Sequence, residues 1–205
     1  SNTGGSNKVA SMVVFMDGEK ENKHYRHFKI KTVTGANDFA SMEEALQRRL
    51  SRLERKDKDI SFSQKPDLIV VDGGKGQLSS AIKAAEKSGV DVEIISLAKR
   101  EEEVFVKGKK ESIVLEKDSL ALRLLTRIRD EAHRFAITHH RKLRLKQQTM
   151  SNLKNIEGVG EQKARALLTH FKSVDNIKKA HLDKLQEVKG ITAKIYAGCR
   201  SILTL

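Results

Sequence analysis

The chain has 205 residues, a length that is enough for one ordinary domain and a small second one. Of these residues 38% are hydrophobic and 33% are charged. The 40 Lys and Arg against 27 Asp and Glu give a net charge of +13, which favours a polyanionic partner, nucleic acid before acidic membrane. The single cysteine, Cys199, excludes an internal disulfide, and no apolar run reaches the roughly 20 residues that cross a bilayer. We therefore expect a soluble, cytoplasmic protein without a membrane partner.

The first 65 residues predict a β-hairpin and a helix. Residues 9–15 (VASMVVF) have the composition of a strand, Asp17-Gly18 is a strong turn signal, and residues 24–33 alternate like a second, antiparallel strand. From Asp38 to about residue 53 apolar residues recur at helical spacing.

The next part of the chain alternates strands and helices. The apolar run from Leu68 into Asp72 predicts a strand that is covered on both faces. A helix over residues 77–87 follows, then a second covered strand over residues 92–97. Residues 103–116 predict a small hairpin with its turn at Lys107-Gly108. Strands of this kind are typical of an α/β sheet.

The longest predicted helix runs from Asp118, a candidate N-cap, to about residue 146, without Gly or Pro. Its second half contains the densely basic sequence RKLRLK, residues 141–146. Residues 150–153 are a candidate linker. The apolar stripe of this helix consists of Leu120, Leu124, Ile128, Ala132 and Phe135.

A weak internal repeat fills the C-terminal part of the chain. Residues 153–171 and 185–203 each hold an apolar turn, then Gly-x-Gly or Gly-x-Thr, then a helix. The glycines permit a tight turn, and the free N–H groups at the start of the helix attract phosphate, which binds DNA without reading bases. This pattern resembles the helix-hairpin-helix family in its doubled form; the alternative is an ordinary helical bundle with glycine caps. The candidate DNA-binding residues are Gly158, Gly160, Lys163 and Arg165 in the first copy, and Gly190, Thr192 and Lys194 in the second.

Asp72 is the strongest candidate for a chemical role. A carboxylate at the end of a strand, followed by the small residues Gly73 and Gly74, stands where an α/β sheet commonly holds a metal or a reacting group. The glycines would let a bulky ligand come close. The sequence lacks the spacing of a phosphate-binding loop or of a dinucleotide-binding motif. The alternative is an aspartate that only begins a turn.

Three blocks occur in an order that is specific to one family: PDLIVVDGGKGQ (66–77), LAKREE (97–102) and LRLLTRIRDEAHRFAITHHR (122–141), followed by the paired hairpins. With these blocks nearly the whole chain resembles the C-terminal half of the UvrC family, the incision subunit of bacterial nucleotide excision repair. The resemblance implies a fold similar to ribonuclease H, a mixed five-stranded sheet flanked by helices, followed by a small all-α tandem helix-hairpin-helix domain. The implied domains are 1–148 and 153–205.

The resemblance also implies an active site of two aspartates and a histidine around Mg²⁺ or Mn²⁺. By motif match, Asp72 is one aspartate and a metal ligand, and His133 is the histidine, which would position or deprotonate water or protonate the leaving oxygen. The other aspartate belongs to the motif D-x-S-H/N-x-x-G, whose latter part matches SNTGG at residues 1–5, so that it falls two residues before Ser1. Asp38 matches an acidic family position; it is a candidate outer-shell acid or, equally, a helix N-cap.

The function implied is an endonuclease that makes the 5′ incision beside a lesion in double-stranded or bubble DNA, with UvrB as partner of the full-length protein. Without the first aspartate, this chain is expected to cut weakly or not at all. Two other functions stay open: a DNA-binding module with a silent nuclease domain, and a nuclease for RNA–DNA hybrids or junctions. Candidates for a phosphate track, with solvated charges as the alternative, are Lys99, Arg129, Arg134 and Arg141.

Overall fold

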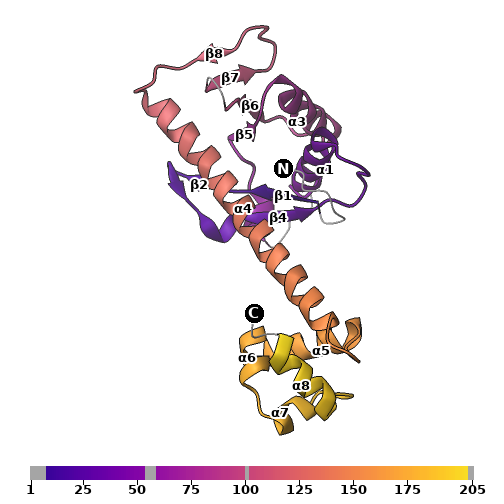
Figure 1. Cartoon of the computed structure of the whole chain (residues 1–205). Helices are drawn as coiled ribbons and strands as arrows, with labels where there is room; N and C mark the ends of the chain where they lie inside the picture. Colours follow the sequence, from indigo (N-terminus) through magenta and orange to yellow (C-terminus); the bar gives the residue numbers. More distant parts are fainter. Residues whose placement is uncertain (1–7, 54–58, 100–101, 203–205) are drawn as a thin grey trace. The chain divides into compact units, whose positions relative to one another are not determined.

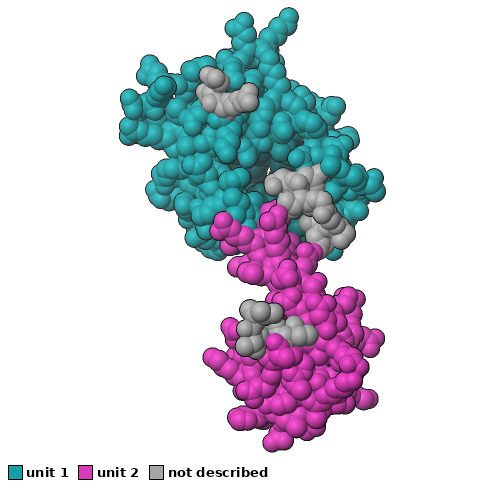
Figure 2. All heavy atoms as spheres, viewed as in Figure 1, with its two compact units in different colours: residues 1–137 teal, residues 138–205 magenta. Residues whose placement is uncertain are grey.

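A computed structural model of the chain describes residues 8–53, 59–99 and 102–202. The chain forms two compact units, Ser1–Ile137 (unit 1) and Thr138–Leu205 (unit 2), which Figure 2 distinguishes by colour. Unit 1 combines a mixed sheet with helices, whereas the described part of unit 2 is helical, so the predicted fold classes are confirmed. In the described part of the chain, no helix has both the length and the apolar composition for crossing a bilayer.

Unit 1 begins with two short antiparallel ladders. Strand β1 (Val9–Met12) pairs with β4 (Arg26–Lys29), and β2 (Phe15–Met16) pairs with β3 (Glu19–Lys20). The predicted turn is confirmed, because Asp17 (φ 52°) and Gly18 (φ 79°) both have the positive φ of a two-residue hairpin turn. The prediction of one continuous strand over residues 9–15 was wrong, because β1 ends at Met12 and β2 begins at Phe15. The short helix η1 (Asn22–His24) lies between β3 and β4, and no helix lies between β1 and β2. The two halves of the hairpin therefore cannot pair without a break.

The larger sheet of unit 1 has the order β5-β6-β7-β8 and mixed strand directions. Strand β5 (Leu68–Asp72) runs parallel to β6 (Glu93–Leu97), and the hairpin of β7 (Glu103–Val106) and β8 (Ile113–Val114) continues the sheet antiparallel. The predicted strand that ends at Asp72 is therefore confirmed. Among the described strands, the β1–β4 ladder and this sheet are separate hydrogen-bonded pieces, and β5 lies at an edge of its piece.

Helices α1 (Asp38–Leu50) and α3 (Lys75–Lys87) lie side by side in unit 1, and α2 (Ile60–Ser63) is a single turn (Figure 1). The apolar positions predicted for α1 end in Leu50, which is fully buried. It packs with Val71 of β5 and Leu78 of α3, so the helix pair covers the strand that ends at Asp72.

Helix α4 (Leu120–Lys154) is longer than predicted. It begins beside Ser119, whose Oγ accepts a hydrogen bond from Leu122 N at 3.2 Å, so Ser119 takes the capping role expected of Asp118. The buried side is centred on Leu122 and Leu125, whereas Leu120 of the predicted stripe is 81% exposed. Leucines occupy several faces of this first segment of α4. The helical spacing of apolar residues therefore did not identify which face is buried.

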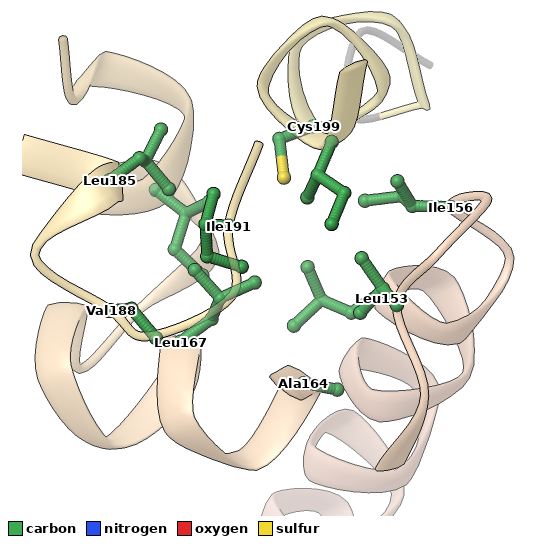
Figure 3. Close-up of a cluster of buried hydrophobic side chains, with 11 residues drawn as sticks. Leu153, Ile156, Ala164, Leu167, Leu185, Val188, Ile191 and Cys199 are labelled. Atoms are coloured by element: carbon green, nitrogen blue, oxygen red, sulfur yellow. The ribbon is translucent and has the colours of Figure 1, made fainter. Parts of the chain in front are cut away.

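The predicted helix end near residue 146 and the predicted linker were wrong. Residues 150–153 belong to α4, because Leu153 is fully buried in the core of unit 2 and packing keeps these last turns helical. The remaining helices are α5 (Glu161–Phe171), α6 (Val174–Lys179), α7 (Leu182–Gln186) and α8 (Ala193–Ile202). Figure 3 shows how side chains from these helices converge with Leu153, among them Leu167 and the Cys199 thiol.

Gly198 of α8 shows how tightly this core is packed. A Cβ at this position would lie 2.6 Å from Cγ2 of Ile156, which is only 2% exposed. Overpacking of this kind costs about 2 kcal/mol, while alanine gains about 1 kcal/mol over glycine in a helix. We expect Gly198→Ala to lower the free energy of unfolding by about 1 kcal/mol in urea titrations.

Gly76 of α3 provides the matched control for this substitution. A Cβ there would also lie 2.6 Å from its neighbour, but that neighbour is the ring of Phe39, which is 46% exposed and can turn aside. We therefore expect Gly76→Ala to be neutral or stabilising. Equal effects of the two substitutions would contradict the tight packing inferred at Gly198.

Candidate active site and nucleic-acid interface

Asp72 lies at the carboxyl end of β5, the end of a parallel strand at which α/β sheets place their ligands. Its neighbour across the ladder is Leu97 of β6, and the N–H of Gly73 donates to the carbonyl oxygen of Leu97 at 3.0 Å. The Asp72 residue itself is exposed. The fold therefore fixes the backbone of Asp72 and leaves its carboxylate open to a ligand.

The two glycines after Asp72 have different roles. Gly73 has φ 142°, and a Cβ on it would lie 2.5 Å from the side chain of Gln77. Gln77 Oε1 accepts a hydrogen bond from the N–H of Gly74 at 3.1 Å, which caps the start of α3. The space at Gly73 is thus filled by the protein. Gly74 has no heavy atom within 4 Å of a Cβ position, so of the two glycines only Gly74, two residues after Asp72, has the open space expected of both.

Asp38 lies at the start of α1. The N-cap of this helix is Asn37, whose Oδ1 accepts from the N–H of Ala40 at 3.0 Å, so the capping role considered for Asp38 was wrong. Asp38 is exposed, and the next residue, Phe39, packs against Gly76 of α3. This contact brings the start of α1 beside the segment that follows Asp72. The outer-shell role of Asp38 stays a prediction.

The block that contains His133 anchors α4 to the first hairpin through a buried carboxylate. Glu131 is 3% exposed. Its Oε2 accepts from Lys20 Nζ of β3 at 2.7 Å, and its Oε1 accepts from Arg134 Nη2 at 2.6 Å. Hydrogen bonds from these two cations hold the pKa of Glu131 at about 2. The sequence offered a signal for this residue that the prediction missed: an acid between Ile128 and Phe135 of the apolar stripe.

Phe135 completes this anchor, and His133 takes no part in it. The Phe135 ring stacks on His27 of β4, with ring centres 4.0 Å apart, and meets Tyr25 edge to face at 5.1 Å. Residues 131 and 135 share one side of the helix, whereas His133, two positions from each, points to the other side. His133 is exposed and makes no hydrogen bond or ion pair with the rest of the described chain. Its imidazole is therefore available for proton transfer.

The two arginines of this block considered for a phosphate track are paired with acids. Arg129 contacts Glu102 at 3.4 Å and Asp130 at 3.2 Å, and its side chain is 11% exposed. Arg134 pairs with Glu131. Both arginines therefore have acidic partners within the described residues, and their place in a phosphate track stays a prediction.

The donor chemistry of Asp72 fits Mg²⁺ or Mn²⁺, because these hard cations prefer carboxylate oxygens. Within residues 8–53, 59–99 and 102–202, no group of three or more His, Cys, Asp or Glu side chains is placed to hold a metal ion. Residues 1–5, which match the other aspartate's motif, lie outside the described residues. Asp72 and His133 as a metal-dependent pair stay a prediction.

The predicted C-terminal repeat is present in unit 2 as two equivalent turns. Gly158 (φ 81°) and Gly190 (φ 85°) have the same left-handed conformation, which favours glycine. The N–H of Val159 donates to Ile156 O at 2.9 Å, and that of Ile191 donates to Val188 O at 3.2 Å. These four apolar residues are buried, so each turn is fixed to the core by its two apolar side chains.

Thr192 fits the second turn although the first has glycine there. Gly160, the N-cap of α5, has φ −84°, a conformation that any residue adopts. The N–H of Ile195 points to Thr192 Oγ1 at a long 3.5 Å, as for a threonine at the start of a helix. Both copies therefore present the start of a helix after the turn.

The cations of the two turns are held by exposed, weak contacts. Lys163 Nζ donates to Gly158 O at 2.9 Å, and Lys194 Nζ of the second turn pairs with Glu157 of the first at 2.6 Å. Arg165 pairs with Glu161. Exposed ion pairs contribute about 0–1 kcal/mol, so these side chains can exchange their partners for phosphates at little cost. Their contact with DNA stays a prediction.

Comparison with known proteins adds to this geometry. A family model described as the UvrC RNase H endonuclease domain matches residues 1–137, and a model of the SAM-like helix-hairpin-helix tandem matches residues 150–196. UvrABC system protein C of Dehalococcoides mccartyi strain BAV1 is 45% identical over 99% of this chain, and that of Methanosphaera stadtmanae is 48% identical over 95%. The chain spans 34% and 33% of the length of these relatives.

The endonuclease-domain match covers unit 1, and the tandem match covers both turns of unit 2. The mixed sheet with Asp72 at a strand end and the paired helical hairpins agree with those two descriptions. The chain therefore belongs to the UvrC family and corresponds to the C-terminal part of its members.

Proposed function

We propose that this chain is a metal-dependent DNA endonuclease that makes the 5′ incision beside a lesion, as part of an excision nuclease. The observation that carries the proposal is the exposed Asp72 at the carboxyl end of β5, followed two residues later by Gly74, whose Cβ position is open space. Membership of the UvrC family supports the reaction class.

In this proposal Asp72 holds Mg²⁺ or Mn²⁺ through its carboxylate. The cation, when bound, neutralises charge on the phosphoryl oxygens and makes a water molecule nucleophilic. His133 moves a proton, either from the attacking water or to the leaving oxygen, with an imidazole that no described side chain engages. Asp38 would orient the water shell from the adjacent start of α1.

A second carboxylate completes the proposed metal site. The motif at residues 1–5 assigns it to an aspartate two residues before Ser1. A single carboxylate binds a divalent cation weakly, because affinity rises with the number of charged ligands. We therefore infer that this 205-residue chain cuts DNA poorly by itself.

The two helical turns of unit 2 would hold the duplex by its backbone. Helix starts and nearby cations bind phosphates without reading the base sequence. Such binding suits a nuclease that acts beside DNA lesions, because lesions occur in any sequence. Double-stranded or bubble DNA is the proposed substrate. UvrB is the proposed protein partner of the full-length molecule.

The proposal is tested by extending the chain at its N-terminus with Asp-Asn. We expect the extended chain to nick a bubble duplex in Mn²⁺ at least about 10-fold faster than the original chain, and to bind Mn²⁺ more tightly in calorimetry. An extension with Asn-Asn is the matched control and should change neither quantity.

The same assay separates the rival functions. Faster cleavage of an RNA–DNA hybrid or of a junction than of the bubble would assign a different substrate. DNA binding without nicking by any of the three chains would contradict the catalytic proposal and leave a binding module.

A further inference from the structure

The second half of α4 carries positive charge and no acidic side chain. The 25 residues from Ala132 to Ile156 contain no Asp or Glu. Four cations lie within six positions of this stretch, and each of them is exposed; they are Arg141, Lys142, Arg144 and Lys146.

These four cations have no acid partner, although many cations elsewhere in the described chain have one. Arg26, Lys87 and Arg129 of unit 1 all form ion pairs, as do Lys184 and Lys194 of unit 2. Within the described ranges, none of the four cations of α4 makes an ion pair or a side-chain hydrogen bond.

The four cations also share one broad face of the helix. At about 100° per residue, they fall within roughly 200° of the helix surface, centred on Leu145. Leu145 is 67% exposed, so this face is not covered by the protein. The opposite side carries Leu143 and Met150, both half-buried, and Met150 packs against the core of unit 2.

Helix spacing makes this arrangement unfavourable in the absence of a ligand. Arg141 and Arg144 are three positions apart, and Lys142 and Lys146 are four apart, the distances at which like charges on a helix repel. An anion that lies along this face would relieve that repulsion. The spacing of several charges along one helix suits a polymer of phosphates better than a single small anion.

We propose that residues 141–146 of α4 form a second DNA-binding surface, separate from the two helical turns, which contacts the phosphate backbone of double-stranded DNA. This inference rests on the proposed function as a DNA-acting protein. The surface supplies charge without a base-reading geometry, so its contribution is independent of DNA sequence.

The test is the salt dependence of duplex binding, measured by fluorescence anisotropy with this chain and a labelled, undamaged duplex. One variant replaces the four cations by Gln: Arg141→Gln, Lys142→Gln, Arg144→Gln and Lys146→Gln. The matched control removes the same charge from exposed lysines of unit 1: Lys29→Gln, Lys31→Gln, Lys83→Gln and Lys117→Gln. Circular dichroism checks that both variants keep their helix content.

Each phosphate contact contributes about 0.9 to the slope of log affinity against log salt, so we expect the α4 variant to reduce that slope by about 3 to 4. Its affinity at low salt should fall by about 10-fold or more, while the control changes the slope by less than about one. Equal losses in the two variants would overturn the proposal in favour of general attraction by net charge.

Other outcomes separate this inference from the proposed function. If the original chain shows no salt-dependent duplex binding, the proposed DNA-directed function fails as well. If it binds steeply and the α4 variant binds equally well, only the second surface is refuted. If only binding to phosphatidylserine-rich vesicles depends on the four cations, the surface recognises anionic lipid, and the DNA proposal is refuted.

Discussion

We expect Asp72→Asn to abolish the proposed metal-dependent nicking by the N-terminally extended chain, with a loss of at least about 100-fold. The substitution keeps the size of the side chain and removes the negative charge that would hold the cation. It leaves the fold intact, because Asp72 is exposed and its backbone contacts do not depend on the carboxylate. Initial rates on a bubble duplex in Mn²⁺ measure the effect.

Asp67→Asn provides the control, since Asp67 is also exposed and stands just before the other end of β5. It should nick at the rate of the unsubstituted chain. Both variants should bind the duplex in the absence of metal with unchanged affinity. Full nicking activity of the Asp72→Asn chain would contradict the assignment of Asp72 as the metal ligand, whatever the helical turns of unit 2 contribute to DNA binding.

The second large effect is expected at Glu131, the buried carboxylate between Lys20 and Arg134. Glu131→Gln removes the charge that strengthens three hydrogen bonds from Lys20 and Arg134, and we expect the free energy of unfolding at neutral pH to fall by about 2 kcal/mol. Urea titration measures this quantity. Glu116→Gln, at an exposed site without an ion pair in the described chain, is the control and should be neutral.

The dependence on pH provides a further check on Glu131. Its pKa in the folded state, about 2, lies below the ordinary value of 4.5. The stabilisation is therefore present above about pH 4.5 and is lost as pH falls from there towards 2. The advantage of the original chain over Glu131→Gln should shrink over this range. A constant difference between pH 7 and pH 3 would show that packing, and not charge, accounts for the loss.

The sequence predicted best those features that depend on local patterns. The strand ending at Asp72, the turn at Asp17-Gly18 and the two glycine turns each follow from a few adjacent residues with strong conformational preferences. The assignment of Asp72 as a candidate ligand depended on the same local pattern, a covered strand that runs into an acid and two glycines.

Features that depend on long-range packing were predicted less well. The end of α4 is set by the burial of Leu153 against helices that come later in the chain, and composition around residue 146 gave no sign of it. The role of Gly73 depends on Gln77, which folds back on it. The anchor at Glu131 depends on Lys20, more than a hundred positions earlier. Local patterns carry little information about such partners.

Helix α4 contributes side chains to two cores: Leu125 packs with Leu97 and Val104 in unit 1, and Leu153 is buried in unit 2. Between these two leucines lie four exposed basic residues, Arg141, Lys142, Arg144 and Lys146. Trypsin cleaves the peptide bonds that follow such residues. The sparse packing of this stretch favours the local opening that a protease requires. A single cut there would divide the chain into two fragments, each with its hydrophobic core complete, which makes this segment the natural place for separating unit 1 from unit 2.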